Sequence, residues 1–320
     1  MNPPASLRHT ASLALTGPLL LLLLLLPTAG CRHHPDPAAP GQAAAKGRTN
    51  AAETYAVRGV VLEIPADRRS ARIKHEAIPG YMAAMTMPFD VHDPHELDGV
   101  NPGDQIAFRL NVTATDGWID RIEVKETGQL PDPKVKVDTL RKVRIVDELN
   151  EGDVMPDYKF VNEQRRPTTL GQFRGQALGI TFIYTRCPYP TFCPRQSTQF
   201  AAACQQLLAR PGGPTNWHLL SISFDPAHDT PSVLRNYART YKYDPQRWNF
   251  LTGEMIDIDA ITEQFGMFFA RDGEGFSHNV RTVVINAAGR IQKIWVGNQW
   301  TAEEFVAEMI RAAPSPSPSP

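Results

Sequence analysis

The sequence predicts two domains, a small all-β barrel of the OB type followed by an α/β domain. Between residues 55 and 125, short runs of strand-forming residues alternate with turn residues, which is typical of a small barrel. From residue 148 to 312, apolar runs of strand length alternate with helical periodicity, as expected for a sheet packed against helices. A chain of 320 residues is long enough to form two hydrophobic cores.

The composition gives no indication of nucleic-acid binding. The formal net charge is −1 and 42% of the residues are hydrophobic, whereas a nucleic-acid-binding domain needs a concentration of basic residues. The four cysteines are too few for a disulfide framework. They are Cys31, the pair Cys187 and Cys193, and Cys204.

Residues 1–31 are typical of an export signal. Arg8 and His9 precede an unbroken run of leucines at 19–26, which is short for a membrane span. The sequence Thr28-Ala-Gly-Cys31 resembles a bacterial lipoprotein box, which implies lipidation of Cys31 and a protein anchored on the periplasmic side of a membrane. A plain signal peptide with an incidental cysteine is the alternative. In both cases the mature protein is expected to work outside the cytoplasm.

The barrel is expected to span residues 55–126 between two linkers. Its predicted strands are 55–64, 71–75, 86–91, 105–112 and 118–124, separated by turn signals such as Asn101-Pro-Gly-Asp104. The segment 32–54 is rich in Ala, Pro and Gly, and the segment 127–147 is charged and contains prolines. We interpret both as linkers, with one strand expected around residues 143–146.

A group of soft ligands lies inside the barrel sequence. Three methionines, Met82, Met85 and Met87, follow His75, and alternation along a strand puts Met85 and Met87 on the same face. Thioether sulfur and imidazole suit Cu(I) and are poor ligands for magnesium or calcium. The alternative interpretation is that the methionines fill the barrel core and His75 lies on the surface.

The Met85-Thr-Met87 segment with its upstream histidine resembles the periplasmic copper-binding domain typified by CusF. This resemblance implies that His75, Met85 and Met87 bind copper. In that family a tryptophan caps the metal by a cation–π contact. Met82 occupies the tryptophan position here, so the cap is either absent or replaced by a third sulfur.

The second domain, residues 148–312, is expected to end in two strands and a helix. The predicted strands are 158–162, 177–184, 217–224, 280–286 and 291–296. Helices are predicted at 195–209, from Pro231 onward, at 256–265 and at 305–312, the last after a capping box at Thr301 and Glu304. We interpret Cys204 as a core thiol, and Asp225 and Asp229 as an Asx turn and a helix cap. No function is assigned to the tail, 313–320.

Cys187 and Cys193 lie between the strand at 177–184 and the helix at 195–209. Pro194 is typical of a first helical turn, which places Cys193 at the helix N-terminus, where the helix dipole favours a thiolate. A thiol pair in this position suits redox chemistry or binding of a soft metal. A structural disulfide is the alternative.

The segment 184–194, Tyr-Thr-Arg-Cys-Pro-Tyr-Pro-Thr-Phe-Cys-Pro, resembles the signature of the Sco/SenC family, thioredoxin-fold proteins that carry copper to cytochrome oxidase. The match continues at 223–231 and 276–286 and covers roughly residues 148–311. Five residues separate the two cysteines, a longer spacing than is usual in that family. The resemblance implies a thioredoxin-like fold and a copper site formed by Cys187, Cys193 and His278.

The two resemblances together imply a periplasmic Cu(I) chaperone, with Cu(II) as an alternative at the Cys/Cys/His site. The barrel would acquire copper, and the second site would deliver it to the copper-bearing subunit of cytochrome c oxidase. Other periplasmic copper carriers and thiol reductants are further expected partners. Two alternatives stay open, a thiol–disulfide reductase that keeps the oxidase cysteines reduced and a copper-sequestration protein. A peroxidase or a zinc enzyme is not favoured, because the matching residue patterns are missing.

Overall fold

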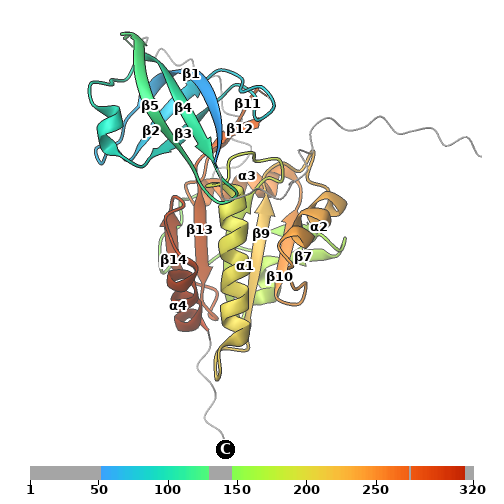
Figure 1. Ribbon diagram of the computed structural model, residues 1–320. Helices are drawn as coiled ribbons and strands as arrows, with labels where there is room; N and C mark the ends of the chain where they lie inside the picture. Colours follow the sequence, from blue (N-terminus) through green and yellow to red (C-terminus); the bar gives the residue numbers. More distant parts are fainter. Residues whose placement is uncertain (1–51, 130–145, 274, 314–320) are drawn as a thin grey trace, which may run out of the picture. The chain divides into compact units, whose positions relative to one another are not determined.

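The computed structural model describes residues 52–129, 146–273 and 275–313 (Figure 1). All of these residues belong to one compact unit. The predicted export signal with Cys31, most of both predicted linkers and the tail after residue 313 lie outside the described residues. None of the described helices is long and apolar enough to cross a membrane.

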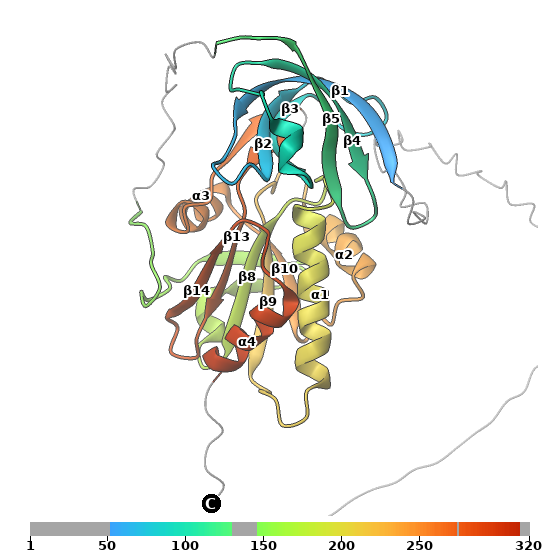
Figure 2. The same ribbon diagram turned by 60° about the vertical axis from the view of Figure 1, so that its left-hand side comes forward.

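The first domain is a closed barrel of five strands (Figures 1 and 2). The strands are β1 (Glu53–Glu63), β2 (Ser70–His75), β3 (Met85–Val91), β4 (Gln105–Val112) and β5 (Gly117–Glu126), with a 3₁₀ turn, η1 (Pro94–Leu97), after β3. Their order is β1-β2-β3-β5-β4, and β1 pairs with β4 to close the ring. The predicted small barrel is therefore confirmed, with every predicted strand found within two residues of its expected ends.

Alternating side chains of the barrel strands form its core. Every second residue of β3, from Met85 to Val91, is buried, and the residues between them are partly exposed. His75, at the end of β2, pairs with Met85 of β3 in the antiparallel register. Its side chain is only 2% exposed, so the alternative that placed His75 on the surface is wrong.

The second domain is built on a sheet of seven strands. The strands are β6 (Lys159–Asn162), β7 (Pro167–Thr169), β8 (Ala177–Ile183), β9 (Trp217–Ser223), β10 (Trp248–Thr252), β13 (Arg281–Ile285) and β14 (Ile291–Val296). Their order is β14-β13-β8-β9-β10-β6-β7. β8, β9 and β10 run parallel to one another, whereas β13 and β6 are antiparallel to their neighbours. The sheet is a thioredoxin-like arrangement, as predicted.

Helices cover both faces of this sheet. They are α1 (Cys193–Ala209), α2 (Pro231–Thr240), α3 (Met255–Gln264) and α4 (Ala302–Ala312), with a 3₁₀ turn, η2 (Leu170–Phe173), after β7. α1 and α4 pack against each other and on β8 (Figures 1 and 2). Gly179 of β8 faces Phe305 of α4, while Phe182 on the other face contacts Phe265 at the end of α3. The predicted capping box at Thr301 and Glu304 is present.

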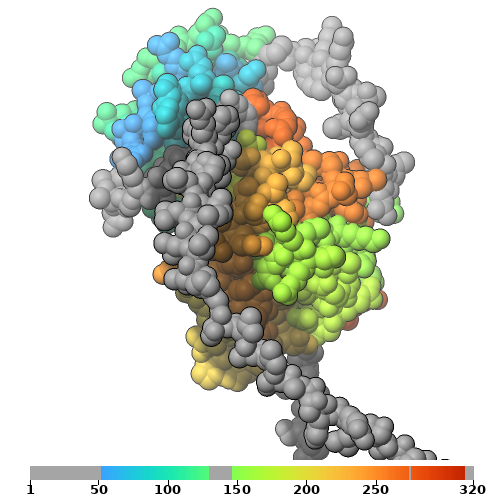
Figure 3. Space-filling model, turned by 90° about the vertical axis from the view of Figure 1, so that its right-hand side faces the viewer, coloured from blue at the N-terminus to red at the C-terminus, as the bar shows by residue number. Residues whose placement is uncertain are grey.

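The buried side chain of Glu163 stabilises the edge of the sheet formed by β6 and β7. Glu163, in the turn between β6 and β7, is fully buried. Its side chain accepts a hydrogen bond from the Phe250 backbone N–H at 2.9 Å, and its backbone carbonyl accepts one from Arg235 of α2 at 2.9 Å. Figure 3 shows this edge, with the light green β6–β7 segment beside orange residues of the same domain.

The sequence did not predict β7, β10 or a separate two-stranded hairpin formed by β11 (Phe269–Asp272) and β12 (Gly275–His278). Residues 269–278 contain glycines and charged side chains, which are typical of loops. The hairpin forms because the backbone groups of the two short strands pair across a tight turn at Gly273, whose φ is +61°.

Candidate metal centres

The loop that carries Cys187 is held by two buried aspartates from the turn after β9. Asp229 accepts hydrogen bonds from the Thr185 backbone N–H at 3.0 Å and from the Thr185 hydroxyl at 2.5 Å. Asp225 is 1% exposed and forms an ion pair with Arg186 at 2.7 Å. Thr185 and Arg186 directly precede Cys187, so these contacts fix the position where the chain leaves β8.

The helix-cap role predicted for Asp229 is therefore wrong. Thr230 is the N-cap residue of α2, and the Asp229 carboxylate is engaged with Ser223 as well as with Thr185. Asp225 also lies 3.5 Å from Arg271 of β11. The sequence marked both aspartates as turn residues, but Thr185, Arg186 and Arg271 are distant along the chain, so these contacts left no local pattern.

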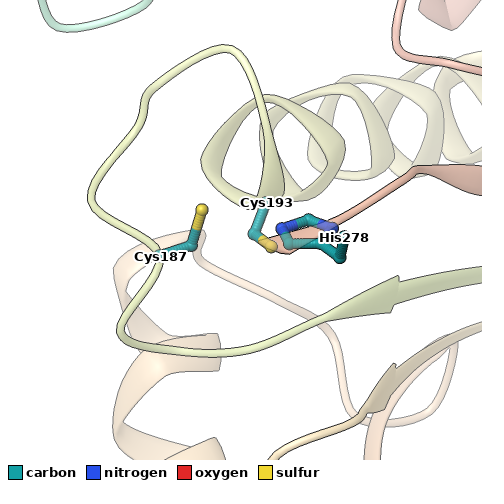
Figure 4. A group of neighbouring side chains, drawn as sticks. All are labelled: Cys187, Cys193 and His278. Carbon is teal, nitrogen blue, oxygen red and sulfur yellow. The ribbon is translucent and has the colours of Figure 1, made fainter. Parts of the chain in front are cut away.

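Cys193 is the first residue of α1, with Pro194 in the first turn, as predicted. Its thiol is 1% exposed, while Cys187 is partly buried. His278 is the last residue of β12. The ligand atoms of Cys187, Cys193 and His278 all lie within 4.8 Å of one another, and Figure 4 shows the three side chains gathered beside the start of α1. Two sulfurs and an imidazole nitrogen are a soft ligand set suited to Cu(I).

Hydrogen bonding orients the imidazole ring of His278. Its Nδ1 lies 2.8 Å from the carbonyl oxygen of Asn279. A carbonyl oxygen only accepts, so Nδ1 carries the hydrogen in the neutral ring and Nε2 carries the lone pair. The ring is enclosed by Tyr184, Phe192 and Phe224 in aromatic contacts, which restrict its rotation.

The two thiols differ in acidity. Burial alone would raise the pKa of Cys187, but hydrogen bonds with Cys193 and His278 outweigh it and lower that pKa well below the usual value. Burial and the neighbouring Cys187 sulfur raise the pKa of Cys193 well above its usual value. The helix N-terminus predicted a thiolate at Cys193. The structure instead assigns the thiolate to Cys187, because one negative charge in this enclosed site opposes a second.

A second soft-ligand group lies at the paired ends of β2 and β3. Met85 and Met87 both point into the barrel core, and His75 pairs with Met85 across the strands. The Nδ1 of His75 lies 2.7 Å from the Glu76 carbonyl oxygen, so Nε2 again carries the lone pair. That nitrogen is buried without a hydrogen-bond partner, and burial lowers the pKa of His75. An unpaired, neutral imidazole nitrogen is costly in a core and is a ready metal ligand.

Met82 and three further histidines, His92, His95 and His218, lie outside both ligand groups. Met82 is buried in the barrel core beside Ile78 and does not line the cavity into which Met85 and Met87 open. His218 bonds to Asn249 at 2.8 Å, and His92 and His95 lie beside Asp116 and Asp98. Each of these three histidines thus has a polar partner within the protein.

The same small cavity is lined by residues of both domains. Met85 and Met87 lie on its wall together with Cys187, His278 and Tyr189. Its volume is about 20 Å³, which is room for about one water-sized particle. The sequence placed the two ligand groups in separate domains, and nothing in it indicated that they share a cavity.

A larger cleft of about 1050 Å³ reaches His278 from another side. Phe192, Arg195 and Asp90 are among the residues that line it. His278 and Phe192 therefore line both the small cavity and this cleft, so the edge of the ligand group at His278 borders a space large enough to admit a segment of another molecule.

Two separate segments of the chain match known family models. Residues 146–313 match the SCO1/SenC family model, and residues 54–124 match the model of the copper binding periplasmic protein CusF. The SCO1 protein homolog of Bacillus subtilis is 30% identical over 174 residues, which cover 53% of this chain and 86% of that protein.

Two solved structures are similar to the second domain. A SCO1/SenC family lipoprotein from Bacillus anthracis is 22% identical with a TM-score of 0.46, and the match covers 51% of this chain and 95% of that one. ScoI of Arabidopsis thaliana with copper bound is 16% identical with a TM-score of 0.44, covering 50% and 98% of the two chains.

Proposed function

The chain belongs to the SCO1/SenC family, and from this premise we propose that it is a Cu(I) carrier with two soft-ligand sites. The observation that supports this most directly is the convergence of Cys187, Cys193 and His278, whose ligand atoms lie within 4.8 Å of one another. A thiolate at Cys187 needs no deprotonation before it binds a soft cation. Copper is the cargo here, not a resident cofactor.

The barrel supplies the second site. Its His75, Met85 and Met87 form a set in which no ligand can be lost to a disulfide, which suits an oxidising compartment. The match to the periplasmic copper-binding family model supports this assignment. We place the protein on the periplasmic side of a bacterial membrane, held by a lipid on Cys31.

Delivery is the proposed role of the Cys/Cys/His site. Because His278 borders the open cleft, an acceptor can approach the metal at that edge. We propose that the acceptor is the copper-bearing subunit of a cytochrome c oxidase, whose thiolates would compete for Cu(I) by ligand exchange.

A Cu(I) titration of the reduced full chain against a competing chelator tests the two sites. The wild-type chain is compared with Cys187→Ser/Cys193→Ser and with Met85→Leu/Met87→Leu. We expect each double variant to lose one class of bound copper and keep the other. Cys204→Ser serves as the control, because Cys204 is buried elsewhere on α1. If the Cys187/Cys193 variant binds copper like wild type, the proposal fails.

A thiol–disulfide reductase is the second candidate, supported by the acidic Cys187 beside the less acidic Cys193. In that reaction the Cys187 thiolate attacks a disulfide of the partner, and Cys193 then closes an intramolecular disulfide and releases the reduced partner. Reduction of a copper-free disulfide peptide that carries the copper-ligand cysteines of the oxidase subunit distinguishes the two functions. Fast turnover by a chain that binds no tight copper favours the reductase.

Copper sequestration is the third candidate function, and it must be distinguished from copper delivery. In a copper-stressed bacterial host, Met85→Leu/Met87→Leu is expected to impair oxidase assembly if the barrel feeds delivery. Copper sensitivity with normal oxidase activity would instead assign the barrel to protection.

A further inference from the structure

We propose that the inter-cysteine loop, residues 188–192, docks the barrel onto the second domain so that Cu(I) passes directly from Met85 and Met87 to Cys187 and His278. This inference rests on the proposed function, because it requires both ligand groups to bind copper. It adds a transfer route that avoids water. It also adds a positioning residue, Tyr189, which binds no metal itself.

Tyr189 is the main contact of the loop with the barrel. Its side chain is 1% exposed and belongs to the hydrophobic core of the barrel, not to that of its own domain. The ring packs edge-on against Phe89 of β3 at 5.7 Å between centroids. Its hydroxyl donates a hydrogen bond to the carbonyl oxygen of Gly117 at 2.9 Å. The residues on either side of Tyr189 thus cannot move away from the barrel without pulling a large aromatic ring out of its core.

Gly117 makes room for that ring. A Cβ atom at this position would lie 3.0 Å from Cε2 of Tyr189, which is closer than ordinary van der Waals contact. The backbone at Gly117 is not in the left-handed region, so a side chain is excluded by the tyrosine and not by the backbone conformation. Tyr81 of the barrel adds a hydrogen bond to the Pro188 carbonyl oxygen at 3.1 Å.

The β11–β12 hairpin holds the methionine strand from the other side. A carboxylate oxygen of Asp272 accepts a hydrogen bond from the Thr86 backbone N–H at 2.6 Å, between the two methionines. At Gly275, a Cβ would lie 2.2 Å from the terminal methyl of Met85. This glycine therefore lets the thioether of Met85 approach the strand that ends in His278.

Residues of both domains line the shared cavity on opposite sides. Met85 and Met87 face it from the barrel, and Cys187 and His278 face it from the second domain. Its volume of about 20 Å³ accommodates about one water-sized particle. A copper ion that leaves one ligand group thus meets the other before it meets bulk solvent.

The transfer is a ligand exchange without redox change. A Cu–Sγ bond to the Cys187 thiolate forms as a Cu–thioether bond to Met85 or Met87 breaks, and copper stays Cu(I). A bond to the Nε2 lone pair of His278 forms as the bond between copper and the Nε2 of His75 breaks. When Cys193 joins as the last ligand, its thiol proton leaves to water, and the second thioether is released.

The experiment follows copper from one site to the other in the full chain. With Cys187 and Cys193 oxidised to a disulfide, Cu(I) is loaded at the methionines. A phosphine reductant then frees the thiols, and the Cu(I)–thiolate absorption reports arrival at the second site. A Cu(I) chelator added in excess beforehand traps any ion that enters solvent.

The wild-type chain, Tyr189→Ala and Gly117→Val are compared, because both variants undock the loop and leave every ligand in place. Tyr189→Phe keeps the ring and loses one hydrogen bond. Tyr243→Ala is the matched control, since this tyrosine bonds to Glu163 at 3.3 Å in another part of the second domain. Equilibrium copper affinities of both sites are measured for each protein.

We expect most of the copper of wild type, Tyr189→Phe and Tyr243→Ala to reach the thiolates despite the chelator. In Tyr189→Ala and Gly117→Val the ring of Tyr189 no longer anchors the loop in the barrel core, so the two ligand groups separate more readily. Their mutual effective concentration then falls toward the millimolar range, and a millimolar chelator should raise the trapped fraction about tenfold. Equal trapping in wild type and Gly117→Val, with both affinities intact, overturns the inference and leaves the proposed function standing. If the wild-type chain binds no copper tightly at Cys187, Cys193 and His278, the proposed function itself is refuted.

Discussion

The imidazole of His278 and the carbonyl of Asn279 are joined by a 2.8 Å hydrogen bond through Nδ1. His75 makes the same contact with the carbonyl of the residue that follows it, Glu76, at 2.7 Å. Both candidate metal-binding histidines are thus held as the tautomer that presents Nε2. An outer contact of this kind fixes the ring and strengthens the ligand.

Replacement of His278 tests its part in the site. His278→Ala should lower Cu(I) affinity at the Cys187/Cys193 pair by about tenfold or more, because a two-coordinate dithiolate remains. Chelator competition on the reduced chain measures this loss. His228→Ala is the control, since His228 is an exposed loop residue. The Cu(I) affinity of this variant should match that of wild type. An unchanged affinity in His278→Ala would remove His278 from the ligand set.

The unequal acidity of the thiols gives a second prediction. The pKa of Cys187 is lowered below its usual value by hydrogen bonds with Cys193 and His278, which outweigh burial. Cys187 should therefore be alkylated at neutral pH by iodoacetamide, with Cys193 much slower, as followed by mass spectrometry of the copper-free chain. His278→Ala should move the pH midpoint for Cys187 upward. Faster alkylation of Cys193 than of Cys187 would reverse the assignment.

The ion pair beneath the cysteine loop gives a third prediction. Asp225 is 1% exposed and pairs with Arg186 at 2.7 Å, so Arg186→Gln leaves a buried carboxylate with only the more distant Arg271. We expect the free energy of unfolding to fall by roughly 1–3 kcal/mol. Denaturant titration measures the change, and Arg186→Gln/Asp225→Asn should recover part of it. Additive losses in that double variant would show that the two residues are not coupled.

Asp90 gives a prediction for the pH dependence of stability. Burial and the nearby Asp116 raise the pKa of its carboxyl to about 6. The folded state therefore holds this proton more tightly than the unfolded state, in which the pKa is near ~4. This contribution to stability is complete below about pH 4 and is lost as the pH rises to about 6.

Asp90→Asn should remove that slope. The difference in unfolding free energy between Asp90→Asn and wild type is expected to grow between about pH 4 and 6 and then stay constant, at roughly 1–3 kcal/mol. Urea unfolding at a series of pH values provides the measurement. A difference that is constant from pH 4 to 7 would place the Asp90 pKa at its ordinary value.

The sequence predicted the regular strands well because their pattern is local. The alternation in β3, for example, is visible as Met85, Met87, Phe89 and Val91, and the barrel burial follows it. The β11–β12 hairpin escaped prediction because its two strands are only four residues long, and one of its contacts, between Asp272 and Thr86, joins residues far apart in the chain. Its residues carry no strand pattern of their own.

The candidate ligands were predictable as residue types, but their surroundings were not. Met85-Thr-Met87 and the cysteine pair are visible in the sequence. Tyr189 was not singled out, although its placement between the cysteines makes it the link to the barrel core. The predicted thiolate at Cys193 was wrong, because a sequence shows where the helix starts but not the neighbouring Cys187 sulfur that raises the pKa of Cys193.

Cys204 bears on how the chain matures. It is buried on α1, and burial raises the pKa of its thiol to about 11, so it is almost entirely un-ionised at neutral pH. It lies eleven residues after Cys193 on the same helix, a separation of roughly 16 Å at the helical rise, which is far too long for a disulfide. Cys193 therefore cannot pair with Cys204 while α1 is folded, whereas the Cys187 sulfur lies within 4.8 Å of the Cys193 sulfur. An oxidant that reaches the folded protein converts Cys187 and Cys193 to a reducible disulfide and leaves the buried, un-ionised thiol of Cys204 unreacted.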